Sequence, residues 1–148
     1  MEAEFSIDAD DINALARLII PNGLGLKAGQ ELLIPASVEA LPLVRELASE
    51  AYKSGCALVT PMLTDSAFEV ARIKWAHEDY LGAENLWLAE AYASAYAGGA
   101  ARLALTGSDP NLLQGLDQDR IDAVAKSHIN ARRITGRFSS ESIINWTI

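Results

Sequence analysis

The stretch "RLALTGSDPNLLQGLDQDRI", Arg102 to Ile121, decides how this chain of 148 residues is organised. An apolar run ends at Thr106-Gly107, and Asp109-Pro110 then breaks the chain before a helical pattern opens at the acidic positions 117 and 119. This order of strand, loop and helix is typical of the carboxyl end of a parallel strand. Open α/β sheets bind their ligands at such ends. The stretch therefore predicts both a fold class and the place of a site.

The rest of the chain alternates in the same way. Four short, bounded apolar runs predict strands near Glu31–Ala36, Cys56–Leu63, Ala101–Thr106 and Ser142–Ile148. Apolar residues spaced at i, i+3, i+4 and i+7 predict helices at Ser6–Ile20, Ser37–Lys53, Asp65–His77, Glu84–Tyr96 and Leu116–Arg133. Alternation of this kind implies right-handed crossovers. We expect an α/β three-layer sandwich with a mostly parallel sheet of at least four strands and helices on both faces.

Several single residues refine this expectation. Pro61 lacks an amide donor, so its strand should end there or lie at the edge of the sheet. The three tryptophans have no cage-like spacing and are expected in the core. The bulk of the helix near residues 65–77 is assigned to Phe68, Ile73 and Trp75. The packed face of the last helix is assigned to Ile121, Val124, Ala125, His128 and Ile129.

Composition bounds the class of protein. The length suggests a single α/β domain spanning residues 1–148, and half of the residues are hydrophobic. The net charge is −8, from 12 basic and 20 acidic residues, which argues against nucleic acid or an anionic membrane as partner. No apolar run approaches the roughly 20 residues that a membrane-spanning helix needs. We therefore expect neither a nucleic-acid partner nor a membrane partner.

The single cysteine and the first residues bear on location. Cys56 has no cysteine partner and precedes the apolar run "ALV", so it is interpreted as a buried core thiol rather than a nucleophile. The acidic start "MEAEFSIDADD" lacks the basic and apolar parts of a signal peptide. Both observations fit a cytoplasmic protein.

Most patterns that could carry chemistry have a structural explanation. "HED" at His77–Asp79 is interpreted as a solvated helix end rather than a metal ligand cluster. "GLGLKAG" at Gly23–Gly29 precedes a strand and no helix follows it, so it is not a dinucleotide loop. The acidic pairs near residues 10 and 117 suit helix starts, and "ARRITGR" at Ala131–Arg137 suits a helix end rather than a phosphate site. No catalytic residue, cofactor-binding residue or metal ligand is assigned in this chain.

The loop after the third strand is the remaining candidate site. Its ligand-facing candidates are Thr106, Gly107, Ser108, Asp109 and Asn111. Gly107 permits unusual dihedral angles, and Pro110 restrains the residue before it to an extended conformation. The alternative is a plain connection that packs Leu112 and Leu113 as a lid over the end of the sheet.

Three segments together resemble a known family. These are "LKAGQELLIPASVEALPLVRELASEAYKSGCALV", "GAARLALTGSDPNLLQGLDQDRI" and the closing "NWTI", and the likeness spans nearly the whole chain. They resemble the amino-terminal domain of the metal-dependent aminopeptidases related to aminopeptidases T and S. The resemblance implies a homodimeric parent that removes amino-terminal residues from peptides with two divalent metal ions, such as zinc, cobalt or magnesium. In that family the Glu, His, Asp and Tyr ligands lie in a carboxy-terminal domain, so no ligand is transferred to this chain.

Two functional hypotheses follow. In the first, the chain is an amino-terminal scaffold or gating domain, inactive alone, whose partner is the parent's carboxy-terminal domain. The closing strand runs to the last residue, Ile148, and this fits a chain that once continued. In the second, it is a stand-alone α/β binding or interaction module that uses the strand ends near Thr106–Leu113.

Overall fold

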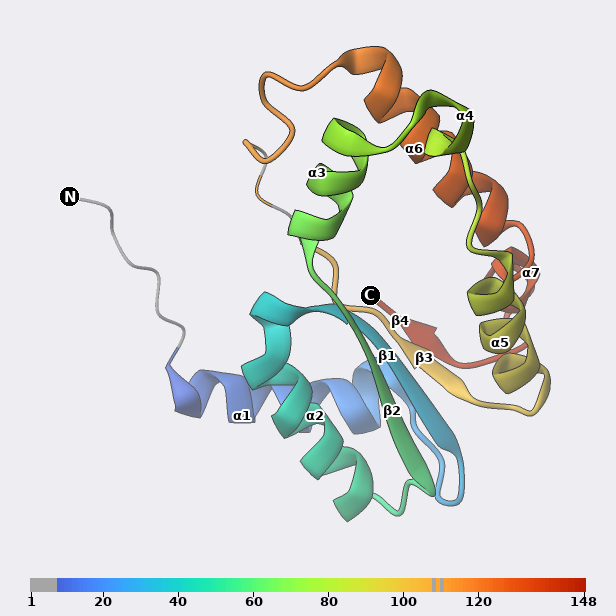
Figure 1. The fold of residues 1–148 in the computed structure, drawn as a ribbon. Coiled ribbons are helices and arrows are strands. Elements are labelled where there is room, and N and C mark those ends of the chain that lie inside the picture. The colour runs from blue at the N-terminus through green and yellow to red at the C-terminus, as the bar shows by residue number, and fades with distance from the viewer. Residues whose placement is uncertain (1–7, 108, 110) are drawn as a thin grey trace.

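The computed structural model describes residues 8–107, 109 and 111–148, and in these ranges the strands form one parallel sheet. The order of the strands across the sheet is β2-β1-β3-β4, and every neighbouring pair is parallel (Figure 1). The strands are β1 (Glu31–Ser37), β2 (Leu58–Thr64), β3 (Ala101–Leu103) and β4 (Trp146–Thr147). The expected α/β fold class is confirmed.

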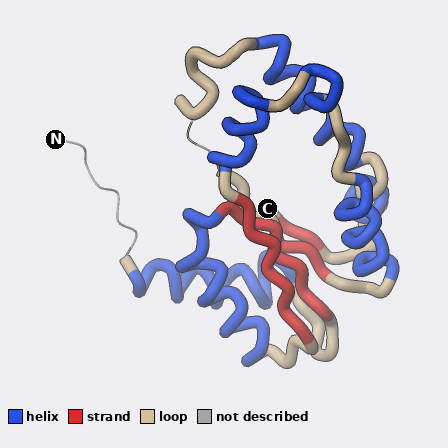
Figure 2. Tube along the Cα trace, in the orientation of Figure 1, coloured by secondary structure: helices blue, strands red, loops and turns tan. Residues whose placement is uncertain are grey.

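Helices precede, connect and cover these strands (Figure 2). The first part of the chain contains α1 (Ala9–Leu18), the π-helix η1 (Ile19–Leu24), the 3-10 helix η2 (Val38–Ala40) and α2 (Leu41–Lys53). The second part contains α3 (Ser66–Trp75), α4 (Glu78–Leu81), α5 (Leu86–Ala97), α6 (Gln118–Arg132) and α7 (Gly136–Ser140). Local chemistry fixes several ends, because Asp8, Asp65 and Asp117 each accept a backbone N–H at a helix start.

Both faces of the sheet carry a hydrophobic core. On one face, Leu32 and Ile34 of β1 pack with α1, η1 and α2, and both side chains are fully buried. On the other face, Leu33 packs with Tyr96 of α5 and Phe138 of α7. Successive side chains of a strand point to opposite faces, so the apolar run of β1 serves both cores.

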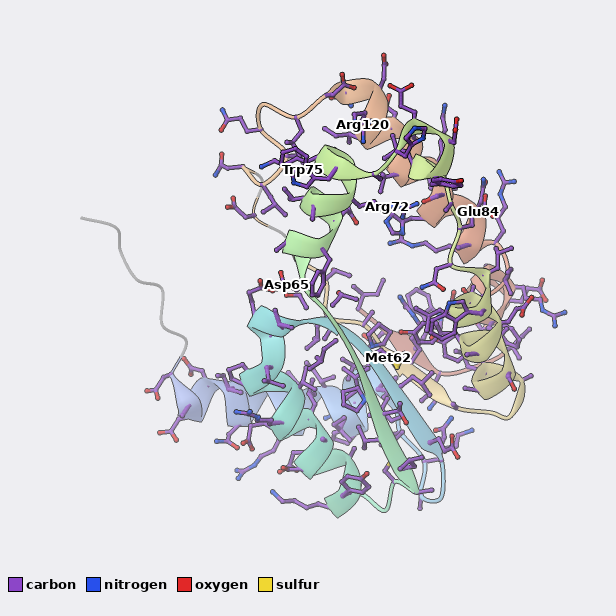
Figure 3. The ribbon with its side chains drawn as sticks, viewed as in Figure 1. Met62, Asp65, Arg72, Trp75, Glu84 and Arg120 are labelled. Carbon is purple, nitrogen blue, oxygen red and sulfur yellow. The ribbon has the colours of Figure 1, made fainter. Side chains whose placement is uncertain are left out.

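A third cluster lies away from the sheet, beyond the carboxyl ends of the strands. Ile73, Leu81 and Val124 form its buried centre, and α3, α4 and α6 surround it (Figure 3). We call these three helices the helical arch. Because this centre has only three buried members, hydrogen bonds contribute much of what holds the arch together.

Two arginines supply those hydrogen bonds. The Arg120 guanidinium donates to the carbonyl oxygens of Ile73 and Ala76, both at 2.5 Å, and so ties the start of α6 to the end of α3. The Arg72 guanidinium donates to the carbonyl oxygen of Leu81 at 2.8 Å and to that of Ala83. Each arginine thus occupies carbonyl groups that a helix end leaves without an internal partner.

The strand expectations are confirmed with changed bounds. β1 and β2 each run one residue beyond the expected end, and Pro61 lies on β2, an edge of the sheet. The regular part of β3 ends at Leu103, although the Leu105 amide still donates to the Pro35 carbonyl oxygen at 2.9 Å. The last strand is much shorter than expected, because a turn at Ser142, with φ at 51°, and irregular backbone up to Asn145 occupy the first expected residues.

The assignment of aromatic residues to the core was wrong. Phe68, Trp75 and Trp87 have exposed fractions of 77%, 82% and 71%, and Trp146 is 41% exposed. Ile73 alone carries the buried face of α3. The sequence pattern places an aromatic residue on a helix face but does not tell whether another element covers that face.

The packed face of the last helix was also misassigned in part. Val124 is buried as expected, but Ser127 is the other buried residue of α6, and Ile129 is 55% exposed. The Ser127 hydroxyl donates to the Val124 carbonyl oxygen at 2.7 Å, which makes its burial tolerable. The expected first helix begins at Ala9, and Ser6 lies outside the described residues.

Removing the Arg120 guanidinium should loosen the arch. We expect Arg120→Ala to lower the free energy of unfolding by about 1.5–3 kcal/mol, because two partly buried carbonyl oxygens lose a charged donor. Urea unfolding followed by circular dichroism measures the change. Arg133→Ala is the matched control, since Arg133 is exposed, and it should stay within about 0.5 kcal/mol. Equal effects of the two substitutions would contradict the assigned role of Arg120.

Candidate functional site

The sheet has a point where its connections turn to opposite sides. β1 is followed along the chain by α2 and β2 on one side, while β3 pairs with the other edge of β1. The segments that leave the carboxyl ends of β1 and β3 therefore separate, and they leave a crevice between them. In open α/β sheets this position is where ligands bind.

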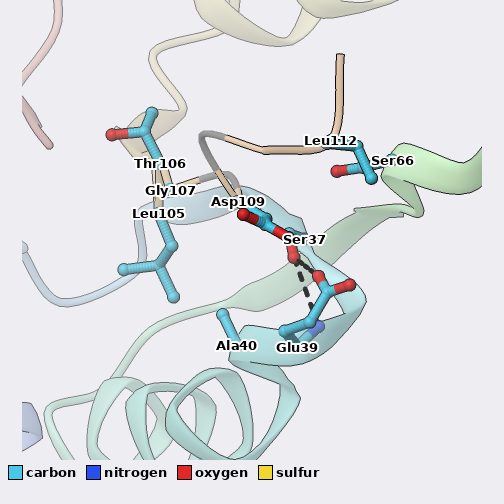
Figure 4. Close-up of a pocket in the computed structure, with 9 residues that line it drawn as sticks. All are labelled: Ser37, Glu39, Ala40, Ser66, Leu105, Thr106, Gly107, Asp109 and Leu112. Carbon is cyan, nitrogen blue, oxygen red and sulfur yellow. Dashed lines mark hydrogen bonds between the residues drawn. The ribbon is translucent and has the colours of Figure 1, made fainter. Parts of the chain in front are cut away.

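A cavity of about 400 Å³ occupies this crevice (Figure 4). Its walls combine hydroxyl, carboxylate and apolar groups from three chain segments. They are Ser37, Glu39 and Ala40 after β1, Ser66 at the start of α3, and Leu105, Thr106, Gly107, Asp109 and Leu112 after β3. Ser37 also accepts a hydrogen bond from the Glu39 amide at 3.2 Å, and its hydroxyl donates to the Glu39 carboxylate.

A larger cavity of about 670 Å³ continues from the first one and shares its β3 loop. It extends under the helical arch toward α5 and the end of α6. Its added polar groups are Arg102 of β3, Tyr92 and Tyr96 of α5, Glu69 of α3, and Arg132 with Thr135 at the end of α6. Pro35, Ala104 and Leu113 add apolar surface.

Two tyrosines that line this cavity, Tyr92 and Tyr96, have raised pKa values. Burial raises the pKa of Tyr96 to about 12, and the positive charge of Arg102 partly offsets this. Burial also raises the pKa of Tyr92, again against the charge of Arg102. The two rings stack with centroids 6.0 Å apart. Both phenols are therefore neutral hydrogen-bonding groups at neutral pH.

The structure brings together most of the loop residues that the sequence singled out. Thr106, Gly107 and Asp109 line both cavities, whereas Asn111 lines neither. The Asn111 amide instead donates to the Asp109 carboxylate at 2.8 Å and stabilises the turn. Ser108 and Pro110 lie outside the described residues.

Two details of the loop were expected differently. Gly107 does not adopt a positive φ, whereas Gly115 at the end of this loop does, with φ at 78°. Leu113 packs on the centre of the helical arch and also lines the larger cavity, while Leu112 lines both cavities.

The described residues do not fit a metal centre. Within them, no group of three or more His, Cys, Asp or Glu side chains could hold an ion. His77 caps α4 by accepting from the Asp79 amide at 3.3 Å, and the half-exposed His128 pairs with Glu69 at 3.1 Å. Burial raises the pKa of the Cys56 thiol, which is buried as expected.

Sequence reasoning missed the residues that other segments bring to the crevice. Ser37 and Glu39 were read only as the start of a helix, and Arg132 only as a cation suited to a helix end. Arg102 gave one usable signal, because a charged residue stands inside the apolar run "RLAL" of a central strand. A buried charge at such a position needs a partner.

Comparisons with known proteins agree along almost the entire chain. A family model described as thermophilic metalloprotease (M29) matches residues 8–148. Aminopeptidase T of Thermus aquaticus is 38% identical over 139 residues, which is 94% of this chain and 34% of that protein. Aminopeptidase AmpS of Bacillus subtilis is 28% identical over 139 residues, or 93% of this chain and 33% of that protein.

A solved structure shares the fold. Wild-type AmpT from Thermus thermophilus superposes with a TM-score of 0.89 at 38% identity, covering 93% of this chain and 34% of that chain. The present chain thus spans about a third of the length of the relatives that it matches. No helix within the described ranges is long and apolar enough to cross a membrane.

Tyr96 should dominate the response of the fold to alkaline pH. Its pKa is about 12 in the folded state, above the ordinary value of 10.0, so folding favours the protonated phenol. This contribution to stability is fully present below pH 10 and is lost as the pH rises from 10 to about 12. Ultraviolet titration of tyrosinate, combined with urea unfolding at several pH values, measures both effects.

Tyr96→Phe should remove the late tyrosinate component and flatten the loss of stability across that pH range. The control is Tyr80→Phe, because the Tyr80 side chain is 71% exposed. That variant should retain the late component. A Tyr96→Phe protein with an unchanged titration curve would disprove the assignment.

Proposed function

Because this chain belongs to the M29 family of thermophilic metalloproteases, we propose that it is the amino-terminal scaffold or gating part of a metal-dependent aminopeptidase. The activity of the whole protein is the removal of amino-terminal residues from peptides. The observation that carries the proposal is the match over residues 8–148, together with relatives that are themselves aminopeptidases T and S. A cytoplasmic location is part of the proposal, and it is supported by the single unpaired cysteine.

The metal chemistry is proposed to reside outside this chain. Two facts support this: the chain spans about a third of its relatives' length, and its described residues offer no fitting set of ligands. Two divalent ions, zinc, cobalt or magnesium, would polarise the peptide carbonyl and activate a water molecule when bound there.

Exposed apolar side chains support a role in assembly. Phe68, Trp75, Tyr80 and Trp87 lie on α3, α4 and α5 with exposed fractions between 71% and 82%. Four large aromatic side chains exposed on successive helices would be covered by a contact with another protein part. The proposed partners are a second copy of the chain, as in a homodimer, and the carboxy-terminal domain of the parent.

A second candidate function is a binding module that acts without catalysis. The observation that favours it is the pair of connected cavities at the crevice between β1 and β3, with Thr106, Gly107 and Asp109 on one wall. The two candidates are compatible, because a binding crevice can belong to a scaffold domain.

The chain alone should neither hydrolyse peptides nor bind divalent metals tightly. We expect aminoacyl chromogenic substrates to stay intact with zinc, cobalt or magnesium added, and calorimetry to detect no stoichiometric micromolar binding of these metals. The control is full-length aminopeptidase T of Thermus thermophilus under the same conditions. Turnover above the metal-only blank would show that catalytic residues lie within this chain and would contradict the proposal.

The exposed aromatic residues should cause self-association. We expect size-exclusion chromatography with light scattering to give a dimer whose fraction rises with concentration. Trp75→Ser should lower that fraction at little cost to stability, because the side chain is 82% exposed. The control is Tyr52→Ser, which removes a half-exposed ring from α2. A chain that stays monomeric at all concentrations would refute self-association through these residues.

A further inference from the structure

The arginine end of the larger cavity has an unbalanced charge. Arg102 and Arg132 both line it, from β3 and from the last turn of α6. Among the described residues, no carboxylate lies within 4.0 Å of either guanidinium. Both guanidinium groups line this one cavity without a carboxylate partner in the described part of the chain, so an anion bound there would gain charge-assisted hydrogen bonds.

Neutral hydroxyl groups share the cavity with these two charges. Tyr92, Tyr96 and Thr135 line it, and the charge of Arg102 acts on both tyrosines. The buried tyrosines remain protonated at neutral pH, so they can donate hydrogen bonds to an anion. Guanidinium and hydroxyl donors together form the kind of site that binds a carboxylate or a phosphate.

The smaller cavity carries carboxylates and, among the residues that the structure describes, no basic side chain, and Asp109 belongs to both cavities. Glu39 and Asp109 line the smaller cavity together with the hydroxyls of Ser37 and Thr106. Neither carboxylate forms an ion pair with a basic side chain of the described residues. This cavity would attract a cationic group such as an ammonium and would repel a dianion such as phosphate. Leu105 and Leu112 line both cavities and provide apolar surface in each.

We propose that this crevice binds a zwitterionic ligand, a free amino acid or a short peptide with an apolar side chain. The ligand's carboxylate lies at Arg102 and Arg132, and its ammonium group lies toward Asp109 and Glu39. Leu105 and Leu112 contact the apolar side chain. The inference rests on the charges and walls of the two cavities, and it does not depend on the proposed aminopeptidase role.

The test is equilibrium binding to the chain itself, without metal, by isothermal calorimetry. The probes are L-leucine, leucyl-leucine, leucinamide, N-acetyl-leucine and inorganic phosphate. We expect leucine or leucyl-leucine to bind, and the tighter of the two identifies the source of the zwitterion. Leucinamide lacks the carboxylate and N-acetyl-leucine lacks the ammonium group, so each should bind at least about tenfold more weakly.

Matched variants locate the site. Arg102→Gln and Arg132→Gln should each weaken leucine binding by about tenfold or more while leaving the affinity for leucinamide unchanged. Arg133→Gln is the control, because Arg133 follows Arg132 in sequence but does not line the cavity. It should bind like the unmodified chain.

Three outcomes would overturn the proposal. One is no binding of either zwitterion, and another is equal binding of leucine and leucinamide. Both are measured on the unmodified chain, so they stay decisive even if a variant fails to fold. Tighter binding of phosphate than of leucine would replace the zwitterion with a phosphate ligand. These experiments measure binding and not hydrolysis. A negative result would therefore reject the zwitterion site without bearing on the aminopeptidase proposal, which the hydrolysis experiment tests.

Discussion

The structure depends on the burial of β1 from every direction. Its edges pair with β2 and β3, and its faces contribute Leu32 and Ile34 to one core and Leu33 to the other. A strand with no solvent-facing side must be apolar throughout, and the run "LLI" meets this condition. Once β1 is central, the carboxyl ends of β1 and β3 meet and the crevice forms between the segments that leave them. The position of the cavities is therefore a consequence of the order of the strands.

Hydrogen bonds from arginine side chains hold the helical arch together to a greater extent than they do the sheet. Its buried centre is small, and the guanidinium groups of Arg72 and Arg120 bond to helix-end carbonyl oxygens across it. Such bonds are directional, so they fix the spacing of α3 and α6 more sharply than apolar packing alone would. This spacing matters for the crevice, because the larger cavity takes one wall residue, Glu69, from α3 and another, Arg132, from α6.

The sequence predicts the strands, helix caps and loops that depend on neighbouring residues. It does not predict burial that depends on residues distant in sequence. The run of β1, the helix-capping aspartates and the loop at Thr106–Asp109 could all be read from neighbours along the chain. Burial of Phe68 and Trp75 could not, because whether a helix face is covered depends on elements elsewhere. The same holds for Arg132, whose meaning changes once α6 is seen to end at a cavity shared with β3. The loop residues of the candidate site were thus predictable from the sequence, whereas the place of Arg102 and Arg132 in the cavity was not.

The two outer strands of the sheet differ in how they could recruit further backbone. An uncovered strand offers its amides and carbonyls to any extended segment, which is the usual route to uncontrolled sheet growth and fibril formation. On β2 the middle position is Pro61, which supplies no N–H, so an added strand would lose a ladder bond there. On β4 only two residues are regular, too few to template a stable neighbour. Addition of a further strand is thereby disfavoured at the β2 edge of the sheet.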